Sequence, residues 1–398
     1  MEEGCALPPD FKAGKVVNGR WRVTEKIGAG GCGAVYEVSD VKNKRFSAAL
    51  KVESNSVGDE GVLKLEAEVL RRLCSLSAHV IRLISAGKRL KYSFLVMTLC
   101  GPDLMFLRRM RGVNKYDHEQ DHFSLETTLR IGVHCLYAIK QVHEIGFVHR
   151  DVKPGNMVIG VNGRDARTVF MIDYEAWGHS LAWKVPKVLR SLGVALISEM
   201  DHYRRPAAGM VRSFTVHDAR NGKLTLRKPR KKVLLRGTLR YCSPNVHRRL
   251  EQGRHDDLWS LLYMLVELCA GLPWNGIKDE NVLFKMKESI GDSLLKKCPA
   301  EFKPISDHLK TLKYEDRPDY LLIYDELMKG VRRLQAHFVD AYDWEDDKDV
   351  EEAHHVQTAL SIREEDKKHD KRNDSFALDF RLYPTTDRKN FSENILGW

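Results

Sequence analysis

The chain has 398 residues, 43% hydrophobic and 30% charged, with a formal net charge of +10, as expected of a soluble globular protein of two domains or one two-lobed domain. A secreted chain is disfavoured, because residues 1–16 lack a signal pattern and the eight cysteines include no CxxC pair. A membrane-spanning chain is disfavoured as well, because the apolar stretch 258–274 is short and contains Glu267. We therefore expect reduced thiols in a cytoplasmic or nuclear protein.

Residues 20–100 have the pattern of β-strands. Two predicted strands, 21–23 and 34–38, flank a glycine cluster, and a third at 48–52 follows them. One helix interrupts the strands at about 60–74, where leucines and an alanine recur at helical spacing. This part of the chain is therefore predicted to be a strand-rich unit with a single helix.

From Ser124 onward the pattern becomes helical. Ser124 is a suitable N-cap, and apolar residues recur at helical spacing as far as Gly146. A short strand-rich stretch, 147–173, precedes a long basic segment, and further helices are expected to about residue 344. The predicted fold class is α+β, with a small strand-rich lobe at about 17–98 and a larger helical lobe at about 101–345.

The two ends of the chain are expected to lie outside these lobes. Residues 1–16 form an N-terminal extension, and residues 346–398 form a charged C-terminal tail. Seven acids and one lysine at 343–352, with basic pairs further on, are typical of a solvated, partly disordered segment. The alternation of Phe376, Leu378, Phe380 and Leu382 leaves open that part of the tail docks as a strand.

A glycine string lies between the first two predicted strands. Gly28, Gly30 and Gly33, with Val35 two residues on, form the pattern G-x-G-x-x-G-x-V. Glycine at these positions lets backbone amides approach phosphate oxygens without obstruction by side chains. Dinucleotide-binding folds use the same letters, but there the string opens a helix. Because a strand follows here, the context favours a loop that covers the phosphates of ATP.

The next residues come in the order that phosphoryl transfer requires. Lys51 ends an Ala-Ala-Leu-Lys strand and would hold the α- and β-phosphates of the nucleotide. Glu66, on the predicted helix that follows, would pair with Lys51. Either residue alone would be taken for a surface charge, and only their order in the series points to chemistry.

The octet His-Arg-Asp-Val-Lys-Pro-Gly-Asn at 149–156 is the strongest motif in the chain. Phosphoryl transfer needs a carboxylate to accept or orient the hydroxyl proton of the substrate, a cation near the migrating phosphoryl group and an amide oxygen for Mg²⁺. Asp151, Lys153 and Asn156 supply these groups in that order. Asp173, in an Ile-Asp-Tyr string, would chelate the Mg²⁺ that bridges the phosphates.

The sequence departs from the usual metal-binding turn directly after Asp173. Such a turn is Asp-aromatic-Gly, but here Glu175 follows Tyr174, and a Gly-Met-Val-Arg string begins only at Gly209. We interpret the 34 residues 175–208 as an insert. Glycine in such a turn allows backbone angles that cost other residues roughly 1–2 kcal/mol. A shift of Asp173 by about 1 Å could lower a rate by on the order of 100-fold.

These motifs resemble the casein kinase 1 superfamily of protein kinases, and within it the tau-tubulin kinases most closely, over about 17–345. The resemblance rests further on Gly-Thr-Leu-Arg-Tyr-Cys-Ser-Pro-Asn at 237–245, Gly-Arg-His-Asp-Asp-Leu-Trp-Ser at 253–260, and Leu-Pro-Trp at 272–274. It implies a bilobal kinase fold, ATP and Mg²⁺ as cofactors, and transfer of the γ-phosphate to serine or threonine hydroxyls of proteins.

The resemblance also implies roles for residues outside the catalytic motifs. Asp257 would steady the catalytic loop, and Arg150 and Arg240 would belong to a pocket that takes an anion, such as a phosphate on the substrate. The residues that the resemblance places around adenine are the gatekeeper Met97, the hinge residues Leu99 and Cys100, and the flanking Ala49 and Val158.

The positive charge is concentrated beside the predicted substrate groove. Residues 175–254 hold 18 Lys/Arg and 5 Asp/Glu, an excess of 13, with a dense run at 227–232. Such a run is either a solvated face, a patch for nucleic acid, or an attractor of acidic or phosphorylated peptides. We expect acidic or prephosphorylated protein substrates and no membrane association, with nucleic acid as the second choice of partner.

Two functions of different classes remain open. A serine/threonine kinase is favoured because the chain keeps all five charged or polar groups of the phosphoryl-transfer set, for which a scaffold has no chemical need. The alternative is a pseudokinase scaffold, inactivated by the 175–208 insert, that binds acidic partners through its basic activation segment. The insert itself is a retained intron or an error of gene prediction, a loop that the kinase tolerates, or the mark of that pseudokinase.

Overall fold

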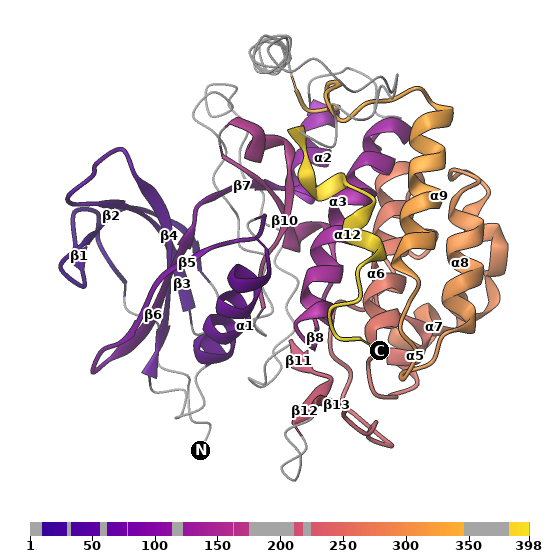
Figure 1. The fold of residues 1–398 in the computed structure, drawn as a ribbon, viewed down its shortest axis with the longest axis horizontal. Helices are drawn as coiled ribbons and strands as arrows, with labels where there is room; N and C mark the ends of the chain where they lie inside the picture. The colour runs from indigo at the N-terminus through magenta and orange to yellow at the C-terminus, as the bar shows by residue number, and fades with distance from the viewer. Residues whose placement is uncertain are drawn as a thin grey trace.

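The computed structural model describes most of the chain, in two lobes (Figure 1). Gly30 and the whole of the predicted insert at 175–208 lie outside the described residues. The described residues are 10–29, 33–55, 62–77, 79–113, 122–161, 163–174, 211–217, 224–345 and 382–397.

The N-terminal lobe is built on one antiparallel sheet of six strands in the order β1-β2-β3-β4-β6-β5. Both faces of this sheet are covered, so its central strand β4 is buried along almost its whole length. One face buries Trp21, Tyr36 and Phe94 in a core of its own, and the other contributes Val35 and Ala49 to the main core. The strands are β1 Val16–Val17, β2 Trp21–Ala29, β3 Gly33–Asp40, β4 Ser47–Ser54, β5 Leu83–Lys88 and β6 Tyr92–Thr98.

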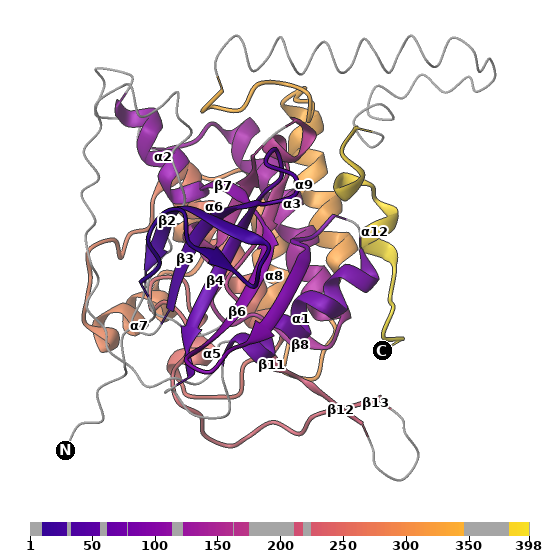
Figure 2. The same cartoon turned by 90° about the vertical axis from the view of Figure 1, so that its left-hand side faces the viewer.

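Helix α1 (Val62–Leu76) is the single helix of this lobe and confirms the helix predicted at about 60–74. It packs against β5 and β6, and Figure 2 shows it beside the sheet. Its buried stripe contains Leu63, Ala67 and Leu70. Because Glu66 lies on the same side, the helix brings a carboxylate, 1% exposed, to the inner face of the sheet.

The C-terminal lobe is helical and is arranged around α3 (Leu125–Glu144), which packs on α6 (Arg254–Ala270) and α9 (Tyr320–Arg333). Ser124 caps α3 as predicted, since its Oγ accepts a hydrogen bond from the Thr127 amide at 3.1 Å. The other helices of the lobe are α2 Leu104–Val113, α5 Pro244–His247, α7 Glu280–Ser289 and α8 Phe302–Thr311, with 3₁₀ turns η2 Pro154–Asn156, η3 Gly163–Arg167 and η4 Gly291–Leu295. The predicted α+β, two-lobed fold is confirmed.

Short strands lie between the lobes and along the lower edge of the helical lobe in Figure 1. They hold the loops that contain Asp151 and Asp173 between paired segments. The pairs are β7 (Cys100–Asp103), β9 (Met157–Gly160) and β10 (Val169–Met171) in the order β10-β9-β7, β8 (Phe147–Val148) with β11 (Arg212–Ser213), and β12 (Thr215–His217) with β13 (Leu224–Leu226).

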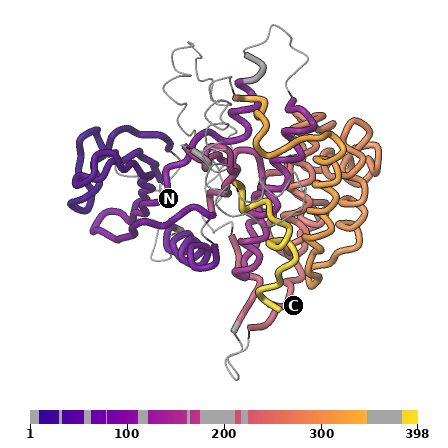
Figure 3. Tube along the Cα trace, turned by 45° about the horizontal axis from the view of Figure 1, so that its top comes forward, coloured from indigo at the N-terminus to yellow at the C-terminus, as the bar shows by residue number. Residues whose placement is uncertain are grey.

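The last described segment, 382–397, packs on the helical lobe, across α3 and α9 (Figures 1 and 3). It contains the turn η5 (Pro384–Thr386) and α12 (Lys389–Ser392). The Phe391 ring stacks on Tyr324 at 4.4 Å between centroids, and Glu144 accepts a hydrogen bond from the Ile395 amide at 2.8 Å. Of the alternating apolar residues of the tail, Leu382 is buried and the other three lie outside the described residues.

No helix in the described part of the chain is both long and apolar enough to cross a lipid bilayer. The apolar stretch at 258–274 falls largely within α6, whose residues are almost all buried against neighbouring helices. Its high hydrophobicity is therefore explained by its central position in the lobe.

Candidate active site

The glycine string connects two antiparallel strands. Gly28 lies opposite Val35, at the ends of β2 and β3. A Cβ built on Gly33 would lie 3.2 Å from the carbonyl oxygen of Val52, because β4 runs directly beside it. A strand therefore follows the string, as the phosphate-loop interpretation requires and a dinucleotide-binding helix would not.

Three buried charges meet where α1 faces the sheet. Lys51 Nζ lies 3.0 Å from Glu66 Oε2 and 3.5 Å from Asp173 Oδ1. Lys51 is held on β4 between β3 and β6, Glu66 comes from α1, and Asp173 follows β10. Residues from three separate elements are thus brought to one point, with side chains no more than 8% exposed.

Acidic groups exceed cations around Asp173. Burial, together with the neighbouring carboxylates of Glu66 and Asp151, raises the pKa of Asp173 to about 6, although Lys51 and Lys153 act to lower it. A divalent cation would relieve this excess, and carboxylate and amide oxygens are ligands that Mg²⁺ accepts. No group of three or more His, Cys, Asp or Glu in the described ranges could bind a metal alone. The site therefore fits a Mg²⁺ ion that takes its remaining ligands from phosphates.

The catalytic loop holds Asp151 in a fixed orientation. Its Oδ2 accepts a hydrogen bond from Lys153 Nζ at 2.7 Å, and its backbone carbonyl accepts one from Asn156 Nδ2 at 2.9 Å. Its Oδ1 accepts two from Thr238, from the amide at 2.9 Å and from Oγ1 at 2.7 Å. Burial raises the pKa of Asp151, but Lys153 and Thr238 outweigh it and lower the pKa below its usual value. The carboxylate is therefore ionised near neutral pH.

Thr238 is a residue of this site to which the sequence analysis gave no role. It belongs to the string at 237–245 that carries the family resemblance, 87 residues from Asp151 in the chain. Gly237, at φ +100°, allows this contact, because a Cβ there would lie 2.4 Å from the Arg150 carbonyl oxygen. The adjacent Gly-Thr pair was the signal in the sequence that could have indicated a close approach.

Asp257 supports the catalytic loop through hydrogen bonds to the loop backbone. Its carboxylate accepts hydrogen bonds from the backbone amides of His149 and Arg150, both at 2.7 Å, and lies 2.9 Å from His143 Nε2. These contacts are buried, and they fix the backbone that precedes Asp151. The geometry agrees with the supporting role that the resemblance implied for Asp257.

Asp173 and Tyr174 are anchored from the catalytic loop as well. Asp173 has φ +66°, Tyr174 donates a hydrogen bond to the Met171 carbonyl oxygen at 3.0 Å, and its ring meets His149 edge to face at 5.6 Å. His149 Nε2 lies 3.1 Å from the Ile172 carbonyl oxygen. The first two residues of the metal-binding turn thus have defined contacts.

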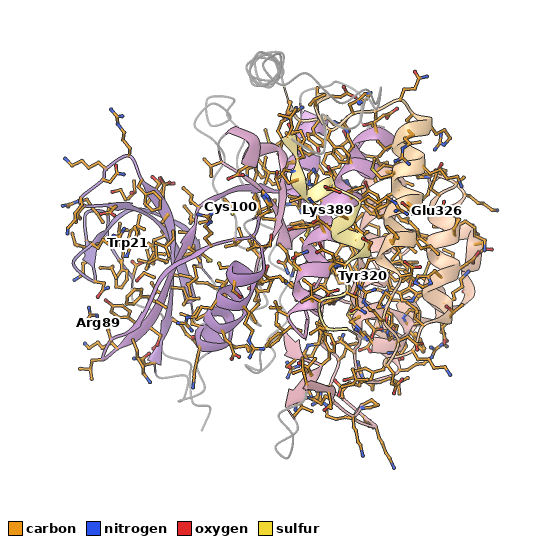
Figure 4. All side chains as sticks on the ribbon, in the orientation of Figure 1. Trp21, Arg89, Cys100, Tyr320, Glu326 and Lys389 are labelled. Atoms are coloured by element: carbon orange, nitrogen blue, oxygen red, sulfur yellow. The ribbon has the colours of Figure 1, made fainter. Side chains whose placement is uncertain are left out.

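The residues predicted around adenine meet at the junction of the lobes, where Figure 4 labels Cys100. Ala49 on β4 pairs with Met97 on β6, and Leu99 joins β6 to Cys100 on β7. Val158 on β9 lies opposite Asp103 on β7. The sites are apolar and mostly buried, as a purine-binding slot requires.

The two arginines predicted to form an anion pocket each lie near carboxylates. Arg240 Nη1 is 2.9 Å from Glu267 Oε1. Burial and the nearby Arg212 and Arg236 lower the pKa of Arg150 to about 9, while Asp257 and Glu251 act in the opposite direction. A shared pocket of Arg150 and Arg240 stays a prediction.

Comparison with known proteins agrees with this geometry. A protein kinase domain profile matches residues 21–179. A Caenorhabditis elegans protein described as a serine/threonine-protein kinase is 34% identical over 340 residues, which cover 85% of either chain. The chain belongs to the protein kinase family. A Dictyostelium discoideum relative of this kinase, also described as a serine/threonine-protein kinase, is 33% identical over 337 residues, 84% of this chain and 58% of its own.

The resemblance to the tau-tubulin and casein kinase 1 groups is confirmed at modest identity. The kinase is 30% identical over 292 residues to a Caenorhabditis elegans protein named inactive tau-tubulin kinase, covering 71% of this chain and 87% of that one. Relatives of this group thus include one that is named as inactive.

Proposed function

We propose that the chain is an ATP-dependent kinase that phosphorylates serine and threonine hydroxyls of proteins. The observation that supports this most directly is the buried set of Lys51, Glu66 and Asp173, in which Lys51 lies 3.0 Å from Glu66 and 3.5 Å from Asp173. The Lys–Glu ion pair and the metal-binding aspartate must both be in place for phosphoryl transfer in protein kinases. Here Lys51 and Glu66 form such a pair, and Asp173, which would be that aspartate, lies beside them in the same buried site.

Each side chain has one task in this proposal. Lys51 orients the α- and β-phosphates, and Asn156 and Asp173 would hold Mg²⁺. Bound Mg-ATP would supply the phosphoryl group and a counter-charge for its oxygens. Asp151 orients the substrate hydroxyl and takes its proton. Lys153, 2.7 Å from Asp151 Oδ2, places a positive charge beside the transferring group.

Thr238 has a part in substrate choice in this proposal. Its two hydrogen bonds fix Asp151 Oδ1, and Lys153 donates to its Oγ1 at 3.4 Å. The three side chains form one network that leaves little freedom to the carboxylate. A serine or threonine hydroxyl, on a short side chain, would then approach an oriented acceptor.

The proposal is tested by incubating the purified full-length protein with Mg-ATP and casein. We expect phosphate on serine or threonine, together with a rise in melting temperature when ATP is added. ATP binding without transfer, in the presence of a range of acidic and primed peptides, would favour the scaffold alternative. That alternative also draws support from the inactive relative.

The basic run at 227–232 consists of two kinds of residue. Arg227 donates to the Thr215 carbonyl oxygen at 3.5 Å, and Arg230 is paired with Glu251. Lys228, Lys231 and Lys232 are exposed. Exposed charges contribute little to stability but attract partners of opposite charge. We therefore assign the preference for acidic or prephosphorylated substrates to the three lysines.

Replacing Lys228, Lys231 and Lys232 with glutamine should raise the KM for acidic peptides several-fold and weaken its salt dependence, because the long-range attraction is lost. The melting temperature and the KM for ATP should stay the same. Peptide kinetics at two salt concentrations measure this effect. A matched triple change of exposed Lys296, Lys297 and Lys313 serves as the control. A fall in melting temperature with unchanged KM would assign the lysines to the fold instead.

A further inference from the structure

A buried carboxylate, Glu251, lies directly beneath the basic segment that leads to Thr238. Its side chain is 2% exposed. Arg230 forms a bidentate ion pair with it, with Nε 2.5 Å from Oε2 and Nη2 3.0 Å from Oε1. The Arg230 backbone amide also donates a hydrogen bond to Oε2 at 3.3 Å. Arg212 Nε lies 3.3 Å from Oε1. One carboxylate thus joins β11 to the basic run.

The charge of the same carboxylate also bears on Arg150 in the catalytic loop. Glu251 is one of the two acids whose charge favours the protonated form of the buried Arg150, while Arg212 and Arg236 oppose it. Burial raises the pKa of Glu251, but Arg230 and Arg212 outweigh this and lower it below its usual value. Glu251 is therefore ionised at neutral pH and lies among arginines from three segments.

The neighbours of Glu251 bind the same segment through its backbone. We call residues 249–252 the anchor loop. The Arg249 carbonyl oxygen accepts a hydrogen bond from the Val233 amide at 2.9 Å, and Gln252 Nε2 donates to the Arg236 carbonyl oxygen at 3.1 Å. The anchor loop thus holds the segment at Arg230, Val233 and Arg236, the last of these two residues before Thr238.

We propose that Glu251 is a built-in counter-ion that keeps the segment 224–238 in the conformation in which Thr238 contacts Asp151. In kinases whose activation segment is ordered by phosphorylation, a phosphate supplies this charge by pairing with arginines. Here the Glu251 carboxylate would supply the negative charge from within the chain, so that the segment is ordered without a phosphate. Glu251 is a positioning residue, and its effect on turnover rests on the proposed kinase function.

Loss of the charge on Glu251 should loosen the segment for two reasons. The bidentate contact with Arg230 would be lost, and the arginines around Arg150 would repel one another without a counter-charge. Thr238 would then move away from Asp151, because it directly follows the residues that Glu251 and the anchor loop hold, at Arg230, Val233 and Arg236. A movement near 1 Å at this point is enough to reduce turnover.

Hydrogen exchange of the full-length protein tests this directly. Glu251→Gln keeps the size of the side chain and removes its charge. We expect amide protection across 224–238 to fall at least tenfold, kcat/KM for a protein substrate to fall by on the order of 10- to 100-fold, and ATP affinity to stay the same. Glu288→Gln removes an exposed pair with Arg248 and should change none of these. Unchanged protection in Glu251→Gln would overturn the proposal.

An added anion distinguishes a counter-ion from a residue that only fills space. In Glu251→Ala, acetate or sulfate should restore protection of 224–238 relative to chloride at equal ionic strength, whereas no recovery with either anion would overturn the proposal. If Glu251→Ala does not fold, Arg230→Gln, at a half-exposed position, should show the same local loss of protection. Phosphatase-treated wild-type protein should remain protected, and loss of protection on that treatment would also overturn it.

These measurements separate the two hypotheses about the protein. Hydrogen exchange measures amide protection of residues 224–238 and does not depend on turnover. Lower protection in Glu251→Gln therefore supports the role of Glu251 even where the wild-type protein transfers no phosphate. Failure of the kinase proposal would appear as absent transfer by the wild type. If the proposal about Glu251 is wrong, amide protection of residues 224–238 in Glu251→Gln will equal that of the wild type.

Discussion

Asp151→Asn should lower kcat by about 10²- to 10⁴-fold, the range typical of a lost general base. The structure indicates a second reason for a large effect. Asp151 Oδ1 accepts from Thr238 and Oδ2 accepts from Lys153. An asparagine can keep only one of these acceptors, and its amide NH₂ would face either the Lys153 ammonium or the two Thr238 donors. The variant would therefore lose both the general base and the hydrogen bonds that orient the side chain at position 151.

The measurement is steady-state phosphorylation of a protein substrate, together with the dissociation constant for ATP. ATP affinity should change little, because the residues predicted to bind adenine lie on β4, β6, β7 and β9 and at the junction of β6 and β7, away from Asp151 in the catalytic loop. Asp307→Asn, an exposed carboxylate on α8, is the control and should retain full activity. If Asp151→Asn phosphorylates at the wild-type rate, Asp151 has no role in the chemistry.

Deleting residues 175–208, so that Tyr174 is followed by Gly209, should raise turnover by on the order of 100-fold if the insert is foreign to the working enzyme. Asp173 and Tyr174 already have defined contacts with Lys51 and His149. What the deletion restores is a glycine directly after them, as in the usual Asp-aromatic-Gly sequence. Both forms should bind ATP, and Mg²⁺ should tighten that binding mainly in the shortened form.

The paired measurement is ATP affinity with and without Mg²⁺, plus turnover, for the two forms. Limited proteolysis adds an independent observation, since cleavage near Lys184, Lys187 or Arg204 is expected first in the full-length protein. A deletion of the same kind elsewhere, for example within 350–375, controls for a general effect of shortening the chain. Equal turnover of the two forms would show that residues 175–208 are a tolerated loop.

Local motifs were sufficient to predict the core of the site. Asp151, Lys153 and Asn156 lie within one octet, and their mutual contacts follow from that spacing. Lys51 and Glu66 could be paired because they follow a fixed order in the chain. The Lys51–Glu66 pair was predicted correctly, and it joins two elements, β4 and α1, that follow one another in the chain.

Contacts between distant segments could not be predicted in this way. Thr238 reaches Asp151 over 87 residues, and Arg230 reaches Glu251 over 21 residues. In the sequence, Arg230 looks like its neighbours Lys231 and Lys232, since all are cations in one run. Only the fold distinguishes them, because it places a buried carboxylate under one and leaves the other two exposed.

The C-terminal tail was predicted only in part, for a similar reason. Its composition is charged, and residues 346–381 lie outside the described residues. The packing of 382–397 depends on partners far away in the chain, such as Tyr324 for Phe391 and Glu144 for Ile395. The charged composition describes the tail as a whole, whereas the packing of residues 382–397 on the helical lobe depends on a few apolar side chains.

The docked end of the chain changes where this kinase domain should be considered to stop. The Asp343 carboxylate accepts a hydrogen bond from Ser124 on the helical lobe, and Leu382 is buried against the same lobe, so the 38 residues between them connect two fixed points. The entropy of closing such a span grows slowly with length, by about 0.6 kcal/mol for each doubling. A change in the length of that span should therefore cost little stability, whereas loss of the Phe391 ring would remove its stacking contact with Tyr324.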